Sequence, residues 1–209
     1  MKKQEVSSLI YNGLGEILIP AGFVGKKTEK CYRKMTNYGF QKIGNSLADY
    51  APTFSFAFFV IIRFDAIEEI LDAALSRPSD YRGVTGTVNL NASFFVGDHL
   101  RFEVHSNAEI TSALKEIAII FENRVFSVLD ACNNIAAVER LLNEGLETKA
   151  KTQIQTDFHA GIVAAALCGR GDFIDIVECY RKSISDYYDE FRLDFEKFVE
   201  YVVQNVVQK

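Results

Sequence analysis

The chain has 209 residues, a formal net charge of −5 and 48% hydrophobic residues, so it can bury a sizeable core and is too apolar to be intrinsically disordered. The negative charge argues against indiscriminate nucleic-acid binding, and no apolar run reaches the length of a membrane-spanning helix. The chain shows no signal-peptide pattern, and its four cysteines have no Cys-x-x-Cys spacing, so we expect a cytoplasmic protein with free thiols.

The first predicted element is an amphipathic helix over residues 4–20. Pro20 and Gly22 end the run, because neither residue type suits the interior of a helix. Gly13 and Gly15 weaken the helix, so packing against other elements must hold it in place. Apolar residues recur at helical spacing along one face: Val6, Leu9, Ile10, Leu14, Ile17 and Leu18.

A basic turn and a hairpin follow this helix. Two strands are predicted at residues 30–35 and 40–46, and Asn37-Tyr38-Gly39 between them has the residue types of a tight turn. These strands and the next one predict an antiparallel meander.

The segment Phe54–Phe64 is predicted to be a central strand. It is rich in aromatic and β-branched residues, and it is too apolar to lie in water. One of its two faces is wholly apolar, so helices must cover it. That face carries Phe54, Phe56, Phe58, Val60 and Ile62.

The order of these features is similar to that of a known family. An amphipathic helix ends in a Gly-Phe-x-x-Lys-Lys turn, which is followed by Tyr-Arg, a strand with Gln-Lys, a hydrophobic strand and an acidic helix. Over residues 1–145 the chain therefore resembles the bacterial domain of unknown function 4304 family. The resemblance implies an α+β fold and assigns no catalytic residues. The matching residues are Gly22, Phe23, Lys26, Lys27, Tyr32, Arg33, Gln41 and Lys42.

A helix and two strands are predicted after the central strand. Asp65 is expected to cap the helix, and Pro78 closes it. Apolar and polar residues alternate over residues 84–90, which predicts a strand with one face in water. A further strand is predicted at residues 100–105.

The remaining half of the chain is predicted to be helical. Ser106-Asn-Ala-Glu109 has the pattern of a capping box. The helical pattern that it opens breaks at Asn133-Asn134 and resumes as far as Gly145. The polar residues 147–156 are then predicted to form a linker.

The last segment predicts a helical hairpin and a long final helix. Helices at residues 158–167 and from Asp172 flank the break Gly169-Arg170-Gly171, and they form one unit similar to an ankyrin repeat. An ordinary helical hairpin is favoured, because repeat arrays need about three units. The final helix carries an apolar stripe that must dock on the sheet or on a second copy of the chain. This stripe contains Tyr187, Phe191, Phe195, Phe198, Val202 and Val206.

Together these elements predict an α+β fold. We expect an antiparallel sheet of four or five strands packed by helices, followed by a C-terminal helical bundle. The expected organisation is an α+β domain over residues 1–146 and a helical extension over residues 147–209 that packs on it.

Motifs that resemble catalytic or metal sites lack essential parts. Gly25-Lys26-Lys27-Thr28 has part of a phosphate-binding loop, but Pro20 replaces the first glycine and a strand follows. Gly44-Asn-Ser46 lacks the final glycine of a nucleophile elbow. His99 and His105 would lie too far apart on an extended segment to share an ion. We therefore predict no catalytic residue, no metal and no cofactor.

One polar group does suggest a binding site. Arg33 and Gln41 are expected to face each other across the hairpin, which places a guanidinium beside an amide on the exposed side of the sheet. Such a surface would suit an acidic partner or a small anion, and the alternative is an exposed polar face without a ligand. The predicted binding residues are Arg33, Gln41, Lys42, Asn45, Tyr81 and Arg82.

Three functional hypotheses remain at this point. The first is a non-enzymatic protein-binding module, such as an immunity-type partner of a bacterial toxin. The second is binding or turnover of a small anionic ligand through the basic sheet face. The third is a homodimeric structural protein that pairs through its C-terminal helix. None of them involves nucleic acid or a membrane.

Overall fold

The computed structural model describes residues 1–97, 100–146, 151–185 and 187–208, without the side chains of residues 151–157. The described chain forms two compact units. The first contains Met1–Ile62 and Asn89–Ala131, and the second contains Arg63–Val88 and Cys132–Lys209. Compactness does not test whether a segment folds independently, so the expected division into residues 1–146 and 147–209 stays a prediction.

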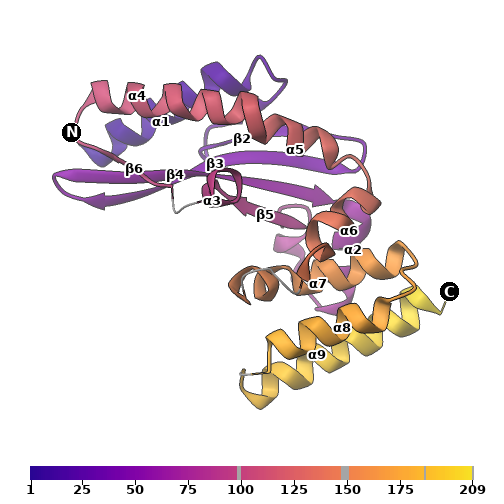
Figure 1. The fold of residues 1–209 in the computed structure, drawn as a ribbon. Helices are drawn as coiled ribbons and strands as arrows, with labels where there is room; N and C mark the ends of the chain where they lie inside the picture. Colours follow the sequence, from indigo (N-terminus) through magenta and orange to yellow (C-terminus); the bar gives the residue numbers. More distant parts are fainter. Residues whose placement is uncertain (98–99, 147–150, 186, 209) are drawn as a thin grey trace. The chain divides into compact units, whose positions relative to one another are not determined.

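The described strands form one six-stranded sheet, which confirms the α+β class (Figure 1). The order is β1-β2-β3-β4-β5, and β6 pairs with β4 outside that path. The pairs β1/β2, β2/β3 and β4/β6 are antiparallel. The strands are β1 (Val24–Lys26), β2 (Cys31–Met35), β3 (Gly39–Tyr50), β4 (Thr53–Phe64), β5 (Val88–Asn91) and β6 (Phe102–Val104).

The phenylalanine-rich segment is the central strand β4, as predicted. β3 and β5 flank it in the sheet, and every residue of its apolar face from Phe54 to Ile62 is buried. The Phe58 ring meets the Phe121 ring edge-on with 4.9 Å between centroids. Burial of this face supplies much of the apolar area that stabilises the first unit.

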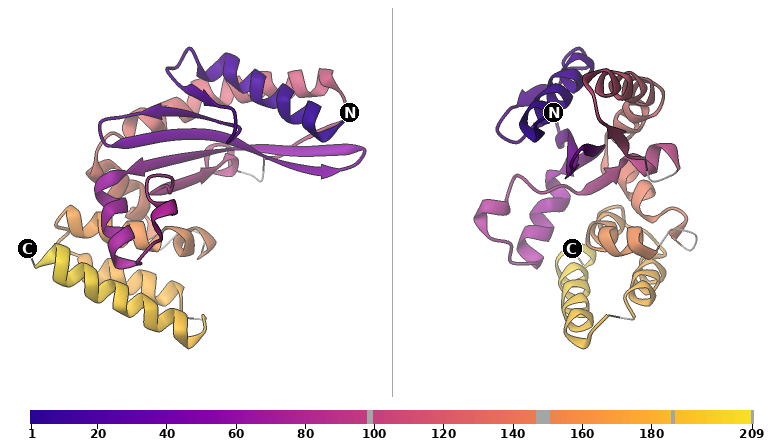
Figure 2. Two further views of the ribbon diagram at one scale, coloured as in Figure 1. Left: turned by 180° about the vertical axis from the view of Figure 1, so that it is seen from behind. Right: turned by 90° about the vertical axis from the view of Figure 1, so that its left-hand side faces the viewer.

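Helices cover one side of the sheet in the first unit. α1 (Lys3–Leu18) and α4 (Asn107–Ile120) lie side by side there (Figures 1 and 2). α1 buries the predicted stripe, including Val6, Ile10 and Leu14. α4 continues through a π-helical turn at Phe121–Val125 into α5 (Phe126–Ala131).

The start of α4 confirms its predicted cap, with one change. The Ser106 side chain accepts a hydrogen bond from Glu109 N at 3.3 Å. The Glu109 carboxylate accepts from His105 N at 2.7 Å rather than from Ser106 N. Glu109 therefore holds the backbone of His105, the residue that follows β6, whereas in a capping box it would bond to the backbone of Ser106.

The second unit is helical, and its helices α7, α8 and α9 lie side by side (Figure 2). α7 begins at Lys151, so the prediction of a linker is wrong for residues 151–156; residues 147–150 lie outside the described part. The helices of this unit are α2 (Asp65–Ala74), α6 (Ile135–Asn143), α7 (Lys151–Leu167), α8 (Phe173–Ser183) and α9 (Asp189–Val202), which ends in a π turn at Val203–Val207.

The apolar stripe of α9 docks on helices of its own unit. α9 contacts α2, α7 and α8, and Phe195, Phe198 and Val202 are at most 2% exposed. The expectation that this stripe needs the sheet or a second copy of the chain is therefore wrong for its buried part.

A buried polar network joins α6, α7 and α8. The Tyr180 hydroxyl donates to Asn143 Oδ1 at 2.8 Å. Asn143 Nδ2 donates to the Gly161 carbonyl at 3.0 Å and to Glu139 Oε1 at 3.1 Å. Arg170 Nη1 completes the network at 2.7 Å from Glu139 Oε1. The network fixes the relative positions of the three helices, because each buried donor has a specific acceptor.

Residues 84–105 differ most from expectation. Only residues 88–91 of the predicted 84–90 strand pair as β5, and a short helix α3 (Ala92–Val96) follows, capped by Asn91. The strand predicted at residues 100–105 is reduced to β6. None of the helices in the described ranges is long and apolar enough to cross a membrane.

Candidate functional site

Two predicted basic residues of the hairpin pair with a carboxylate that the sequence analysis did not consider. Arg33 pairs with Lys42 across β2 and β3, not with Gln41 as expected. Arg33 Nη2 lies 3.2 Å and Lys42 Nζ 3.1 Å from Glu29 Oε2. The Lys42 ammonium is the main cause that lowers the pKa of Glu29. Glu29 therefore cancels one of the two positive charges that this part of the sheet face would offer to an anion.

Gln41 lies on the opposite face of β3. It is buried, and its Nε2 donates to the Leu129 carbonyl at 3.0 Å and to the Tyr38 hydroxyl at 2.8 Å. Its partner in the register is Lys34. The prediction that Arg33 and Gln41 face each other is wrong by one residue, because side chains alternate between faces along a strand.

The structure does not bring the other three predicted binding residues together in one unit. Asn45 lies half-buried on β3 of the first unit. Tyr81 and Arg82 belong to the second unit, where they are exposed at the end of the 3-10 turn Ser79–Tyr81. Their role in binding stays a prediction.

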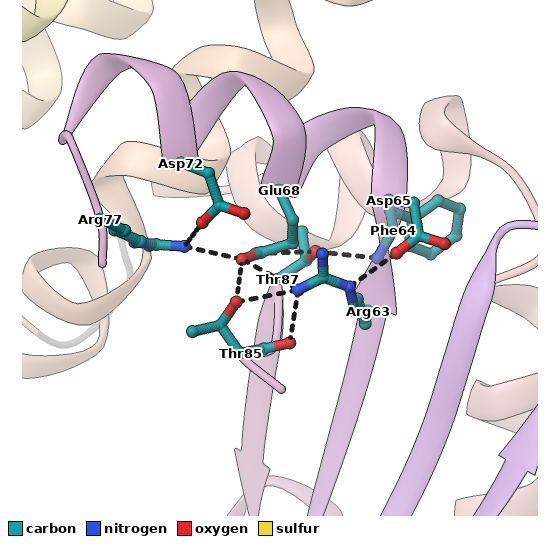
Figure 3. Close-up of polar contacts among 8 residues, drawn as sticks. All are labelled: Arg63, Phe64, Asp65, Glu68, Asp72, Arg77, Thr85 and Thr87. Atoms are coloured by element: carbon teal, nitrogen blue, oxygen red, sulfur yellow. Dashed lines mark hydrogen bonds and ion pairs between the residues drawn. The ribbon is translucent and has the colours of Figure 1, made fainter. Parts of the chain in front are cut away.

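The most heavily bonded polar cluster in the described residues surrounds Glu68 on α2 (Figure 3). Glu68 has no exposed side-chain surface, and its Oε2 accepts from Arg77 Nη1 at 2.7 Å. Two threonine hydroxyls also donate to its carboxylate, Thr85 at 2.6 Å and Thr87 at 3.0 Å. Arg63 Nη1 lies 3.6 Å from the same carboxylate.

The arginines of this cluster, which we call the Glu68 network, are themselves held in place. Arg63 Nε donates to Asp65 Oδ1 at 2.6 Å, and Arg63 Nη1 donates to the Thr85 hydroxyl and carbonyl. Arg77 also pairs with Asp72 at 3.4 Å. Asp65 therefore binds Arg63 instead of capping α2, for which no side-chain cap forms.

The Glu68 network has a structural role. The Glu68 side chain has no exposed surface, so a substrate cannot come within hydrogen-bond reach of its carboxylate, as general base catalysis requires. The network instead ties the end of β4, α2 and residues 85–87 together. It also explains why residues 84–87 leave the predicted strand: Thr85 and Thr87 turn toward Glu68 rather than extend β5.

Other reactive groups are protected by burial. Burial raises the pKa of the Cys132 thiol to about 11, so the thiol stays protonated at neutral pH and is a poor nucleophile. Burial, helped by the charge of Arg77, lowers the pKa of His159 to about 4. In the part of the chain that the structure describes, no group of three or more His, Cys, Asp or Glu residues could hold a metal ion.

A groove of about 500 Å³ runs between α1 and the β1–β2 hairpin in the first unit. We call it the aromatic groove. The Tyr11 and Tyr32 rings stack along it, 4.8 Å between centroids and 22° between planes. The Tyr32 hydroxyl donates to the Tyr11 carbonyl at 2.8 Å, which fixes one ring of the pair. Its lining residues are Tyr11, Asn12, Gly15, Glu16, Ile19, Pro20, Gly25 and Tyr32.

Two glycines make room for the stacked tyrosines. A Cβ at Gly15 on α1 would collide with the Tyr32 hydroxyl, and a Cβ at Gly25 on β1 would collide with the Tyr11 hydroxyl. Gly15 lowers the stability of α1 as a helix, but its lack of a side chain leaves room for the Tyr32 hydroxyl beside the helix. The glycines of the predicted basic turn and of α1 thus shape this groove.

A second, smaller hollow of about 250 Å³ adjoins the aromatic groove, with Tyr11 and Asn12 common to both linings. We call it the lysine pocket. Lys27 and Lys30 come from the turn between β1 and β2, and Lys30 Nζ donates to Ser7 Oγ on α1 at 3.0 Å. Gln4 and Ser8 complete the lining, which contains no carboxylate.

No protein-family model, no curated protein and no solved structure matched the chain. The resemblance to the domain of unknown function 4304 family therefore stays a prediction.

Sequence reasoning missed both hollows. Lys26, Lys27 and Lys30 were recognised as a basic turn, and α1 as an amphipathic helix. The available signal was the run of small and polar residues on the outer face of α1, such as Ser7 and Ser8, close in sequence to such a turn. The sequence did not show that the turn folds back against that face.

Proposed function

We propose that the protein is a non-enzymatic protein-binding module and that its aromatic groove holds an apolar side chain of the partner. The observation that carries this proposal is the stacked Tyr11–Tyr32 pair along a groove of about 500 Å³. Tyr32 is only 3% exposed, so the half-buried Tyr11 is the ring of the pair that a partner contacts. Tyrosine is enriched at protein interfaces, because its ring supplies contact area with few rotatable bonds.

The surroundings of the groove support the same role. Ile19, one of the residues that line the groove, is 60% exposed. Single exposed apolar residues are common on protein surfaces, but this one lines a groove whose volume matches typical ligand-binding hollows. A partner that covered Ile19 would remove apolar area from water, which favours association.

The groove is a better docking feature than the edge of β1. β1 is the terminal strand of the order found in the described residues, but it has only three residues and carries Lys26. Short, lysine-bearing edge strands are a common way to prevent a further strand from pairing. The partner segment is therefore expected to use side-chain contacts in the groove rather than to extend the sheet.

A photo-crosslinking amino acid at position 19 tests this proposal. Expressed in its native cells, the variant should capture a specific partner, and Tyr11→Ala should abolish the capture. The control carries the same amino acid at Ile119, which is 58% exposed on α4 of the same unit and does not line the groove. If positions 19 and 119 capture the same proteins equally, the groove is not the binding surface.

The narrower hypothesis of an immunity-type partner adds one requirement. Binding must then suppress the toxic activity of the captured protein. Co-expression of that protein with the wild-type chain should restore growth, and co-expression with Ile19→Glu should not. Growth of cells that express the captured protein alone would contradict the immunity role while leaving the binding role intact.

A further inference from the structure

We propose that the lysine pocket binds the phosphoryl group of a phosphorylated side chain on the partner. This inference rests on the proposed function, because it treats the lysine pocket and the aromatic groove as two parts of one peptide site. The two hollows share Tyr11 and Asn12 in their linings, so one short segment could place an apolar side chain in the groove and a phosphoryl group in the pocket.

The charge of the pocket fits a dianion. In the described residues, neither Lys27 nor Lys30 forms an ion pair with a carboxylate, in contrast to Arg33 and Lys42, which share Glu29. Two uncompensated ammonium groups match the charge of a phosphomonoester, which is about −1.5 to −2 at neutral pH. A carboxylate would neutralise only one of them.

The hydrogen-bonding groups of the pocket fit a phosphoryl group as well. The Ser7 hydroxyl and the amides of Gln4 and Asn12 line the pocket beside the lysines, whereas the Ser8 hydroxyl already donates to the Gln4 carbonyl. A phosphoryl group offers three acceptor oxygens, more than a carboxylate has. The Ser7 hydroxyl already accepts from Lys30 Nζ, so its own proton remains available to donate to an anion.

The backbone of Lys30 points to a role for its side chain. Lys30 has a positive φ of 50°, a left-handed conformation that glycine and asparagine adopt more readily than lysine. A glycine would make the same turn with less strain. Lys30 therefore occupies an unfavourable backbone position, from which its ammonium group reaches Ser7 on α1.

The test compares three peptide libraries that differ at one fixed position. This position is phosphoserine, glutamate or serine, and the residues that flank it are random and include aromatic residues. Fluorescence anisotropy should show the phosphoserine library binding about tenfold more tightly than the glutamate library, as expected for a second charge-assisted contact. Equal affinity for phosphoserine and glutamate would overturn the phosphoryl assignment.

The double variant Lys27→Ala with Lys30→Gly should remove this preference. Glycine is chosen at position 30 because it tolerates the positive φ, so the fold should be kept, as thermal unfolding would show. The charge-matched control is Lys115→Ala with Lys182→Ala, two exposed lysines outside the pocket. The phosphoryl assignment is wrong if the control and the double variant have the same effect.

Two further measurements separate this inference from the proposed function. Inorganic phosphate alone should bind more weakly than the phosphoserine library, because it lacks the apolar contact in the groove; equal binding would overturn the two-part site. Crosslinking from position 19 should persist in the double variant if only the phosphoryl assignment fails. Loss of partner binding in Ile19→Glu with a retained phosphoserine preference would support the pocket, because Ile19 lines the groove but not the pocket.

Discussion

The Tyr32 hydroxyl donates a hydrogen bond to the Tyr11 carbonyl at 2.8 Å, and the rings of the same two residues stack 4.8 Å apart. The donor lies on a strand and the acceptor on a helix, so one pair of residues both joins α1 to the sheet and forms a wall of the aromatic groove. Burial raises the pKa of Tyr32, which keeps the hydroxyl protonated as a donor. The groove is thus preformed, which lowers the entropic cost of binding.

Tyr32→Phe should keep the stacked ring and lose this hydrogen bond. The Tyr11 carbonyl would lose a donor, so we expect a loss of about 1 kcal/mol in the free energy of unfolding. Urea denaturation measures it. Tyr188→Phe, at a residue that is 67% exposed, should change stability by less than about 0.5 kcal/mol. Equal effects of the two variants would mean that the hydroxyl of Tyr32 contributes nothing to stability.

Gly25→Ala should change the groove rather than the fold. Its Cβ would displace the Tyr11 hydroxyl, and this hydroxyl is the movable end of a side chain. We therefore expect a stability change of less than about 1 kcal/mol but weaker binding of the partner. Gly171→Ala is the control, because a Cβ there would meet nothing within 4 Å. Unchanged binding by Gly25→Ala would show that the position of Tyr11 does not matter.

Glu68→Gln should be strongly destabilising. The substitution removes the fully buried carboxylate that Arg63 and Arg77 share and leaves them only Asp65 and Asp72 as counter-charges, so we expect a loss of about 3 kcal/mol in the free energy of unfolding. Glu69→Gln is the matched control, since Glu69 is the next residue on α2 and is exposed. Chemical denaturation of both variants measures their free energies of unfolding. A loss below about 1 kcal/mol for Glu68→Gln would contradict the structural role of the network.

Stability should fall at acidic pH because of His159. Its pKa is about 4 in the folded state against 6.5 for an ordinary histidine, so the unfolded chain binds a proton first as the pH falls. The contribution of neutral His159 is therefore complete above about pH 6.5 and is lost as the pH falls toward 4, by at most about 3 kcal/mol.

Denaturation of His159→Phe between pH 7 and pH 4.5 isolates this effect. The variant should lose less stability over this range than the wild type, since phenylalanine does not titrate. His105→Asn, at an exposed position, should keep the wild-type pH dependence. A wild-type profile in His159→Phe would show that another group causes the acid sensitivity.

Local patterns in the sequence predicted most of the elements, whereas contacts between distant segments decided the rest. The alternation in β4 and the helical spacing in α1 are local, and both were predicted. Thr85 and Thr87 also alternate, but Glu68 draws them out of the strand through hydrogen bonds across 17 and 19 residues. The observed register of β2 and β3 differs by one residue from the expected one. This shift puts Gln41 on the opposite face of the sheet from Arg33.

The candidate site was less predictable than the fold. The basic residues Arg33 and Lys42 were chosen for their charge, but a single residue in the preceding turn, Glu29, pairs with both and cancels one of their two charges. The lysines that remain uncompensated, Lys27 and Lys30, lie in the same turn. Residue types alone could not separate the two sets, because the separation depends on how the turn folds against α1.

The most direct test of the binding role is the affinity of the crosslinked partner for two charge-insertion variants. Ile19→Glu places a carboxylate in the aromatic groove, and Ile119→Glu places one at a similarly exposed position elsewhere in the same unit. We predict that Ile19→Glu weakens binding about tenfold or more and that Ile119→Glu leaves it within about twofold. Equal affinities of the two variants for the partner would contradict the assignment of the aromatic groove as the binding surface.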